Sequence, residues 1–343
     1  MRVGIVNVTG YAGLEMARLV LQHPKVELTQ VTGRSAAGQR LADFFPHLLD
    51  TDLVIQESIE GSVDVALLAL PHKASAEIAP DLLARGCKIV DISADFRLKD
   101  VSSYEQWYKV THPCPELLAE AVYGLPELHR DEMAKARLVA GPGCYPTSAI
   151  LGMAPAFGLI EPDIIVDAKS GVSGSGRSLS LSNHFSEVNE NVQAYGLSGH
   201  RHLPEMVQEM RVAAVASGQA DDAEKLTVTF VPHLIPMTRG ILSTCYARLR
   251  TPISASDLRE RYRAFYAGHP FVRVVNQPPQ TKQTWGSNYC LIYPTVDART
   301  SRLVVVSCID NLVKGAAGQV VQAMNLMLGF EESLGLDALP VFP

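Results

Sequence analysis

The sequence predicts an α/β protein: a Rossmann-like, doubly wound parallel sheet, followed by an α+β domain with a mainly antiparallel sheet. In the first part of the chain, short apolar runs alternate with segments of helical periodicity, and repeated βα units of this kind form parallel sheets. From about residue 163, strand-like segments follow one another with few helices between them. The length of 343 residues accommodates two domains with sizeable cores.

Apolar runs bounded by turn residues predict the strands of the first domain, and helical periodicity predicts the helices between them. The helix over 11–22 ends before His23 and Pro24, and the helix over 73–85 stops at Gly86. The expected strands cover 2–8, 26–32, 64–70, 88–92 and 137–140.

The second domain is predicted from the change of pattern that follows. A helix over 256–267 interrupts its strands, and a final helix over 316–328 is expected to pack back on the first domain. We place the domain boundaries at 1–145, completed by 312–343, and at 146–311. The remaining expected elements are a helix over 205–216 and strands over 164–168, 226–231, 240–250, 288–293 and 302–309.

The composition is typical of a globular enzyme. The formal net charge is −6, and the absence of a basic tract or charged tail argues against nucleic acid or an anionic membrane as the main partner. The start of the chain lacks the apolar core and cleavage site of a signal peptide, and no apolar run is long enough to span a bilayer. We expect a soluble, cytoplasmic protein that acts on a small molecule.

The six cysteines are dispersed along the chain, with no CxxC pair and no Cys/His cluster at zinc spacing. In a reducing compartment we therefore expect no structural disulfide, and we expect no metal site.

One cysteine stands in an unusual setting, in the segment Gly141-Pro142-Gly143-Cys144-Tyr145-Pro146-Thr147-Ser148. Pro146 at the first helical position, with Thr and Ser beside it, predicts the start of a helix. Cys144 then lies at or just before a helix N-terminus, where the helix dipole favours the nucleophilic thiolate. The alternative is that this cysteine is a small buried hydrophobe.

The turn after the first strand has the pattern of a phosphate-binding loop. Thr9, Gly10, Tyr11, Ala12 and Gly13 lead from a strand into a helix, and glycines in such a turn let the backbone approach a pyrophosphate. The usual fingerprint has glycine at position 7. This chain has asparagine there, a residue that tolerates left-handed backbone. The alternative is a plain tight βα turn.

The segment after the second strand indicates which dinucleotide binds. Arg34 and Ser35 stand where an acidic residue would bind the ribose hydroxyl of NAD, and these two residue types suit a 2′-phosphate, so NADP(H) is favoured. The alternative for Arg34 is a solvated loop arginine.

Two further polar segments follow predicted strands. Arg97, in 91–97, lies past the carboxyl end of a parallel strand and is suited to bidentate binding of an anion, or to a surface ion pair. The segment 169–177 is rich in serine and glycine, and Ser170, Gly171 and Gly174 are candidates to line a pocket. The alternative for that segment is a flexible loop.

The last motif is His200-Arg201-His202, directly before a predicted helix. Histidine is the natural proton shuttle near neutral pH, and Arg201 suits an anionic substrate group. Without other ligands the two histidines make a poor metal site. With a poised cysteine elsewhere in the chain, one of them becomes the candidate acid/base.

Together these residues resemble the N-acetyl-γ-glutamyl-phosphate reductase family of arginine biosynthesis, which is related to the aspartate-β-semialdehyde dehydrogenases. Pro-Gly-Cys-Tyr-Pro-Thr at 142–147 with His-Arg-His at 200–202 is specific to this group. Asn7 replaces the family's common glycine, and Gly141 stands where many relatives carry asparagine. The resemblance covers nearly the whole chain, including 9–13, 70–72, 91–97, 123–127, 170–176, 230–236 and 311–319.

The resemblance implies an NADPH-dependent reduction of an acyl phosphate to an aldehyde. Cys144 is then the nucleophile, one of His200 and His202 shuttles the proton, and Arg97 holds the phosphate. We expect residues 1–145 with 312–343 to bind NADP, and 146–311 to be the catalytic and oligomerisation domain of a homodimer or homotetramer. The further residues expected around the ligands are Gly174 and Asn311 for the cofactor and Ser170, Gly171 and Arg201 for the substrate.

In the chemistry that this implies, the thiolate displaces phosphate to leave a thioester, and hydride transfer then gives an aldehyde. Two alternatives stay open. One is the same reduction of an aminoadipyl or glutamyl phosphate linked to a carrier protein. The other is a non-catalytic, NADP-binding redox sensor that retains the fold.

Overall fold

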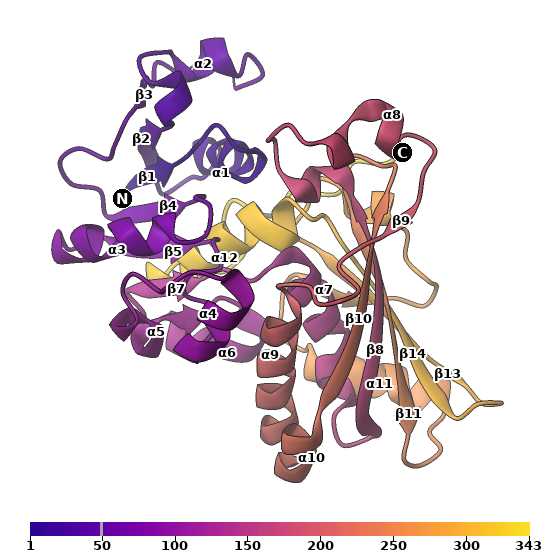
Figure 1. The fold of residues 1–343 in the computed structure, drawn as a ribbon. Coiled ribbons are helices and arrows are strands. Elements are labelled where there is room, and N and C mark those ends of the chain that lie inside the picture. The colour runs from indigo at the N-terminus through magenta and orange to yellow at the C-terminus, as the bar shows by residue number, and fades with distance from the viewer. Residues whose placement is uncertain (49–50) are drawn as a thin grey trace. The chain divides into compact units, whose positions relative to one another are not determined.

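The computed structural model describes residues 1–48 and 51–343, which separate into two compact units. Unit 1 comprises Met1–Pro142 and Ala316–Asp337, and unit 2 comprises Gly143–Gly315 and Ala338–Pro343. Each unit is built on its own sheet (Figure 1). Within the described residues, no helix is long and apolar enough to cross a membrane.

Unit 1 contains a seven-stranded sheet of order β3-β2-β1-β4-β5-β7-β6, in which every strand pair is parallel. The chain order reverses between β1 and β4, the point at which doubly wound sheets bind ligands. The strands are β1 (Arg2–Val6), β2 (Glu27–Thr32), β3 (Ile55–Gln56), β4 (Val65–Leu68), β5 (Lys88–Asp91), β6 (Val122–Tyr123) and β7 (Leu138–Ala140).

The helices of unit 1 pack on this parallel sheet. β4 is continuously apolar and buried, as strands covered on both faces are, and β5 buries Ile89, Val90 and Asp91. The apolar side of α3 joins the same core cluster. Helix α12 contacts α1, α6 and β5. The helices are α1 (Tyr11–Leu21), α2 (Leu41–Phe44), α3 (Ala74–Ala84), α4 (Val101–Tyr108), α5 (Glu116–Glu120), α6 (Pro126–Met133) and α12 (Gly318–Met327).

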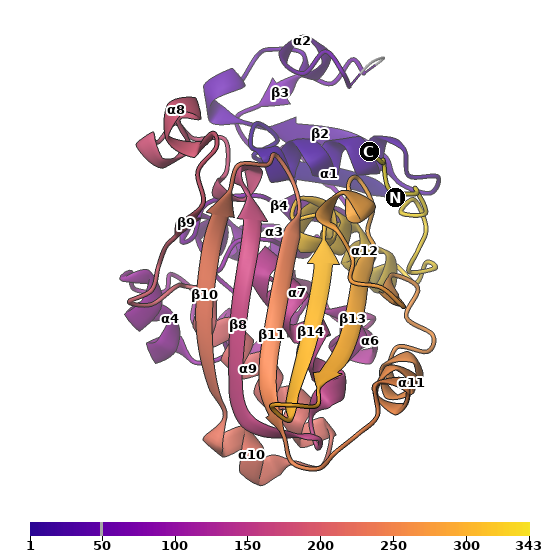
Figure 2. The same cartoon turned by 90° about the vertical axis from the view of Figure 1, so that its right-hand side faces the viewer.

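Unit 2 contains a second seven-stranded sheet, of order β12-β13-β14-β11-β8-β10-β9. β12 pairs with β13 and β8 with β10 in parallel, while the other pairs are antiparallel. Its long strands lie side by side in Figure 2. The strands are β8 (Ile160–Gly171), β9 (Gln193–Ala194), β10 (Thr227–Ile235), β11 (Ile241–Leu249), β12 (Val272–Val274), β13 (Cys290–Asp297) and β14 (Arg302–Ile309).

Helix α7 (Cys144–Met153) is the central helix of unit 2. Residues 145–153 are all buried, and the helix packs on β11 and β14. The buried hydroxyls of Thr147 and Ser148 donate to the carbonyls of Gly143 and Ser307, so the helix can be buried on every side. The other helices of the unit are α8 (Phe185–Val188), α9 (Leu203–Ala216), α10 (Ala220–Lys225) and α11 (Ala255–Phe265).

The predicted fold class is confirmed: a parallel, doubly wound sheet and a second, mainly antiparallel one. The short strands β3, β6, β9 and β12, which form the edges of the two sheets, were not predicted, because two or three residues at a sheet edge form neither a periodic pattern nor a continuous apolar run. The start of α7 was predicted at Pro146, which is wrong, since the helix begins at Cys144. Gly143 is extended and its carbonyl accepts the Thr147 amide, so the helical hydrogen bonds begin there.

Candidate active site

Cys144 is the first residue of α7 and is partly exposed. The other five cysteines are buried, and all six lie in the described part of the chain. Burial raises the pKa of the thiols of Cys87, to about 11, and Cys114, to about 12, which keeps them protonated at neutral pH. A thiol at a helix N-terminus meets the positive end of the helix dipole, so position and exposure both distinguish Cys144 as the candidate nucleophile.

The residue before the cysteine is held by a buried carboxylate. The amide of Gly143 donates to Oε1 of Glu205 over 2.7 Å, and Glu205, on α9, is 1% exposed. This short, buried hydrogen bond restrains the backbone directly before Cys144. Sequence reasoning assigned Glu205 no role. The available signal was an acidic residue in the first turn of a helix that the His-Arg-His motif precedes.

Glu205→Gln should loosen this contact. The neutral amide forms a weaker bond to the Gly143 N–H, so we expect faster hydrogen exchange in a peptide covering 141–148 and a loss of about 1 kcal/mol in the free energy of unfolding. Glu209→Gln is the matched control, because Glu209 lies on the same helix, is 2% exposed and accepts a bond from Gln208 instead. Equal exchange rates at 141–148 in the two variants would contradict the assignment.

A glycine from the end of unit 2 lies against the cysteine. A Cβ on Gly315 would come within 2.8 Å of Cys144 Cβ and 3.3 Å of Cys144 Cα. Real Cβ atoms do not approach this closely, so only glycine leaves Cys144 where it is. Sequence reasoning placed Gly315 at a helix boundary and within the motif 311–319, but did not connect it with Cys144. The close approach joins segments 171 residues apart in sequence, which local pattern does not reveal.

The two histidines lie together beside the residue that follows the cysteine. The rings of His200 and His202 are 4.8 Å apart, and each lies 6.0 Å from the ring of Tyr145. Phe230 and Tyr195 complete this aromatic cluster around His200. Unit 2 therefore brings together the cysteine helix and both histidines, which are separate in sequence.

The environment of His200 restricts its proton chemistry. Its Nδ1 accepts the backbone amide of His202 over 3.1 Å, so in the neutral ring Nε2 carries the proton. Burial, followed by the charge of Arg201, lowers the pKa of His200 to about 4. His200 is therefore neutral at pH 7, and its one lone pair is engaged. Arg201 itself is exposed.

The serine- and glycine-rich segment forms a defined structure with Asn311. The Asn311 amide donates to Ser173 Oγ over 2.9 Å and accepts from the Gly240 amide over 2.7 Å. A Cβ on Gly174 would lie 3.0 Å from Ser170 Oγ and 3.7 Å from Asn311 Nδ2. The alternative of a flexible loop does not fit residues 170–174, which a buried hydrogen-bond network holds.

In unit 1, the turn after β1 and the residues after β2 are neighbours. Gly10 is the N-cap residue of α1, and a Cβ there would meet only Asn7 Nδ2 within 4 Å, at 3.8 Å. A Cβ on Gly33 would lie 2.7 Å from Thr9 Cγ2, so the residue directly before Arg34 is packed against the turn. Arg34 and Ser35 are both exposed. The open backbone at Gly10 fits the close approach of a pyrophosphate.

Arg97 also lies in unit 1 and is almost buried, at 7% exposure. Its Nε donates to the Gly141 carbonyl over 2.8 Å and its Nη2 to the Ile92 carbonyl over 2.6 Å. A surface ion pair, the alternative for this residue, is wrong, because the Arg97 side chain is almost entirely buried. Beside it, burial and then the charge of Asp95 raise the pKa of the Asp91 carboxyl to about 6.

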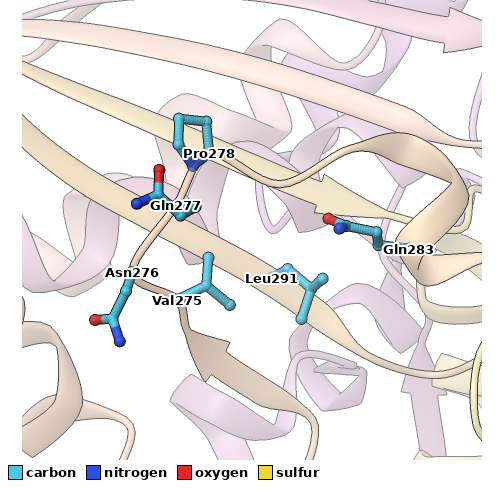
Figure 3. A pocket seen from close by; sticks show the side chains of 6 residues that line it. All are labelled: Val275, Asn276, Gln277, Pro278, Gln283 and Leu291. Carbon is cyan, nitrogen blue, oxygen red and sulfur yellow. The ribbon is translucent and has the colours of Figure 1, made fainter.

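Other features of the surface lie apart from these residues. A pocket in unit 2 is lined by Val275, Asn276, Gln277, Pro278, Gln283 and Leu291 (Figure 3), which include none of the predicted site residues. In residues 1–48 and 51–343, no group of three or more His, Cys, Asp and Glu side chains is placed to hold a metal ion.

Two family models match the chain. The model described as "Semialdehyde dehydrogenase, NAD binding domain" matches residues 2–136, and "Semialdehyde dehydrogenase, dimerisation domain" matches residues 144–311. Fold and matches together define an aldehyde-forming oxidoreductase of the semialdehyde dehydrogenase class, with a domain for a nicotinamide cofactor.

Curated relatives narrow this class. N-acetyl-gamma-glutamyl-phosphate reductases from Dehalococcoides mccartyi and Symbiobacterium thermophilum are 59% and 50% identical, and each alignment covers 100% of this chain and 99% of the relative. The chain belongs to the N-acetyl-gamma-glutamyl-phosphate reductase family.

Solved structures of more distant proteins share the fold. Aspartate semialdehyde dehydrogenase II of Vibrio cholerae, solved in complex with ASA, has a TM-score of 0.73 at 17% identity, covering 96% of this chain and 98% of that one. Aspartate semialdehyde dehydrogenase of Candida albicans, solved with NADP, has a TM-score of 0.71 at 17% identity, covering 95% and 98%.

Proposed function

We propose that this protein is a cytoplasmic enzyme of arginine biosynthesis that reduces N-acetyl-γ-glutamyl phosphate to N-acetylglutamate semialdehyde, with NADPH as the reductant and release of phosphate. The observation that carries the proposal is the partly exposed thiol of Cys144 at the start of α7, with its backbone restrained and two histidines nearby. The names of the relatives at 59% and 50% identity support the choice of substrate.

The first step is formation of a thioester on Cys144. The thiolate sulfur attacks the acyl carbon, the bond from that carbon to the phosphate oxygen breaks, and phosphate leaves with the electron pair. Because Glu205 already accepts the Gly143 amide, we assign stabilisation of the oxyanion to the N–H groups of Cys144 and Tyr145, at the start of α7.

The second step reduces the thioester. When bound in its reduced form, a nicotinamide cofactor supplies the hydride for the acyl carbon. The carbon–sulfur bond of the resulting adduct on Cys144 then breaks, the sulfur leaves as thiolate, and the aldehyde is released. Residues 9–13 with Arg34 and Ser35, all in unit 1, would hold the cofactor. Gly174 and Asn311 stay predicted cofactor residues from the sequence. Because both amide atoms of Asn311 are bonded to protein groups, we assign it to shaping this segment.

We assign the proton shuttle to His202. The neighbouring His200 would have to break its bond to the His202 amide before Nδ1 accepted a proton, and its pKa of about 4 disfavours protonation at neutral pH. His200 then holds the backbone amide of His202 through Nδ1, and the one hydrogen-bond donor that its neutral ring can offer a ligand is Nε2–H. We assign Arg201, Ser170 and Gly171 to the substrate. Arg97, whose Nε donates to the Gly141 carbonyl, is assigned to the phosphate of the substrate.

Arg34→Ala should weaken NADPH binding selectively. An arginine–phosphate contact is charge-assisted, so we expect the Kd for NADPH to rise about 10- to 100-fold and the Kd for NADH to change less than about twofold. Fluorescence titration of the reduced cofactors measures both. Arg40→Ala is the control, since Arg40 is also exposed but pairs with Asp52. Equal losses for both cofactors would contradict the assignment to the 2′-phosphate.

The reverse reaction tests the function as a whole. With N-acetylglutamate semialdehyde, NADP⁺ and inorganic phosphate, we expect formation of NADPH that requires phosphate. Activity only with a carrier-linked aldehyde would move the assignment to the carrier-linked substrate, and cofactor binding without turnover on either aldehyde would favour the redox sensor.

We also propose that residues 1–145 with 312–343 act as the NADP-binding domain and that 146–311 carries catalysis and assembly into a homodimer or homotetramer. The match to a family model described as a dimerisation domain over 144–311 supports this assembly. Light scattering of the purified protein tests it, and a monomeric mass would contradict it.

A further inference from the structure

Asn7 adopts a backbone conformation that is unusual for a residue with a side chain. It follows β1 directly and has φ 67°, in the left-handed region. Glycine is the usual residue for the tight turn at this point of a dinucleotide-binding unit. Asparagine is among the few other residues that tolerate the region, so the chain forms the turn without glycine.

The side chain and amide of Asn7 join three segments of unit 1. Its Nδ2 donates to the Ala69 carbonyl, just past β4, over 2.8 Å. Its Oδ1 accepts the hydroxyl of Thr9 over 3.1 Å, and its backbone amide donates to Thr32 Oγ1, at the end of β2, over 3.2 Å. The turn is thus tied to the strand ends on both sides of β1.

These contacts determine what Thr9 offers a ligand. A threonine hydroxyl has one hydrogen, and here that hydrogen points to Asn7. An anion at this turn would therefore be met by backbone N–H groups at the start of α1 and not by the Thr9 hydroxyl. At Gly13, a Cβ would lie 2.3 Å from the Asn7 carbonyl oxygen, so the helix start is packed directly on Asn7.

We propose that Asn7 is a positioning residue that holds the turn over 7–13 in its cofactor-binding shape before the cofactor arrives. The inference rests on the proposed function, since it takes the ligand to be a nicotinamide dinucleotide. A turn that is already ordered loses less conformational entropy on binding, and this raises affinity. The hydrogen bonds of the Asn7 side chain restrain a turn that glycine at this position would leave more flexible.

Asn7→Gly tests this, because glycine adopts φ 67° and removes only the side-chain contacts. We expect the Kd and KM for NADPH to rise about tenfold, with kcat at saturating NADPH within about twofold of the unsubstituted protein. Lys109→Gly is the matched control. Lys109 is an exposed residue with φ 58° at the end of α4, so it reports the effect of placing glycine at a left-handed position elsewhere in unit 1.

Thr9→Val provides a second variant and a coupling test. If the Thr9 hydroxyl serves Asn7, Thr9→Val lowers NADPH affinity in the unsubstituted protein and has no further effect when combined with Asn7→Gly. An additional loss in the double variant would assign the hydroxyl to the cofactor and overturn the inference.

Unchanged or tighter NADPH binding by Asn7→Gly, with the fold retained by circular dichroism, would also overturn it. Failure of the unsubstituted protein to bind NADPH or NADH would instead overturn the proposed function. The two failures are therefore distinguishable in one set of titrations.

Discussion

Cys144→Ser is expected to lower turnover in the reverse reaction at least ~10³-fold, while the Kd for NADPH and the melting temperature stay close to those of the unsubstituted protein. The hydroxyl is nearly the same size as the thiol but remains protonated at neutral pH and is a far weaker nucleophile. Steady-state rates with N-acetylglutamate semialdehyde, phosphate and NADP⁺ measure the loss.

Cys87→Ser is the matched control for this substitution. Cys87 is 4% exposed, and its thiol contacts the Lys88 carbonyl, a contact that a hydroxyl retains. We expect full activity in this variant. Alkylation should follow the same pattern, since iodoacetamide reacts with exposed thiolates and Cys144 is the cysteine that is not buried. Turnover by Cys144→Ser, or inactivation that tracks another cysteine, would contradict the role of Cys144.

Gly315→Ala is expected to reduce kcat about 10- to 100-fold and to lower the free energy of unfolding by about 1–3 kcal/mol. The added methyl group would lie 2.8 Å from Cys144 Cβ and 3.3 Å from Ile309 Cδ1, so the helix start must move. A displacement of a few tenths of an ångström at the nucleophile is costly, because attack depends on a narrow range of distances and angles.

Gly152→Ala, on the same helix α7, is the matched control. A Cβ there meets Ser307 Cβ at 3.5 Å and Cys245 Sγ at 3.8 Å, which are ordinary contacts. Alanine also favours the helix over glycine by about 0.5–1 kcal/mol, so this variant should be slightly more stable and fully active. Urea denaturation and kcat distinguish the two variants. If both glycine substitutions lowered kcat and the free energy of unfolding alike, the close contact between Gly315 and Cys144 would not be the cause of the loss.

The main strands and helices could be predicted because their signals are local. Apolar runs at β1, β4 and β5 and the helical periodicity of α1 and α9 reflect burial on one or both faces. Short edge strands lack such a pattern, and their pairing depends on neighbours that sequence does not identify. The start of α7 was displaced by two residues because the extended Gly143, and not Pro146, begins its hydrogen bonds.

The candidate residues were recognised from residue type and position: a cysteine at a helix start, a glycine turn after a strand, and two histidines before a helix. Their supporting contacts were not recognised. Glu205 lies 62 residues from Gly143, and Gly315 lies far along the chain from Cys144, yet each contact is made within unit 2. Such contacts follow from packing of the whole unit, which no local pattern encodes.

The pattern of residues along the chain was therefore sufficient for the class of fold, the family and the candidate nucleophile, because periodicity and motifs are properties of neighbouring residues. Packing of distant segments decided the rest: the neutral state of His200, the engagement of Arg97 with backbone carbonyls, and the ties that Asn7 makes to strand ends. Burial and hydrogen bonding act through space, so they become visible only when the chain has folded.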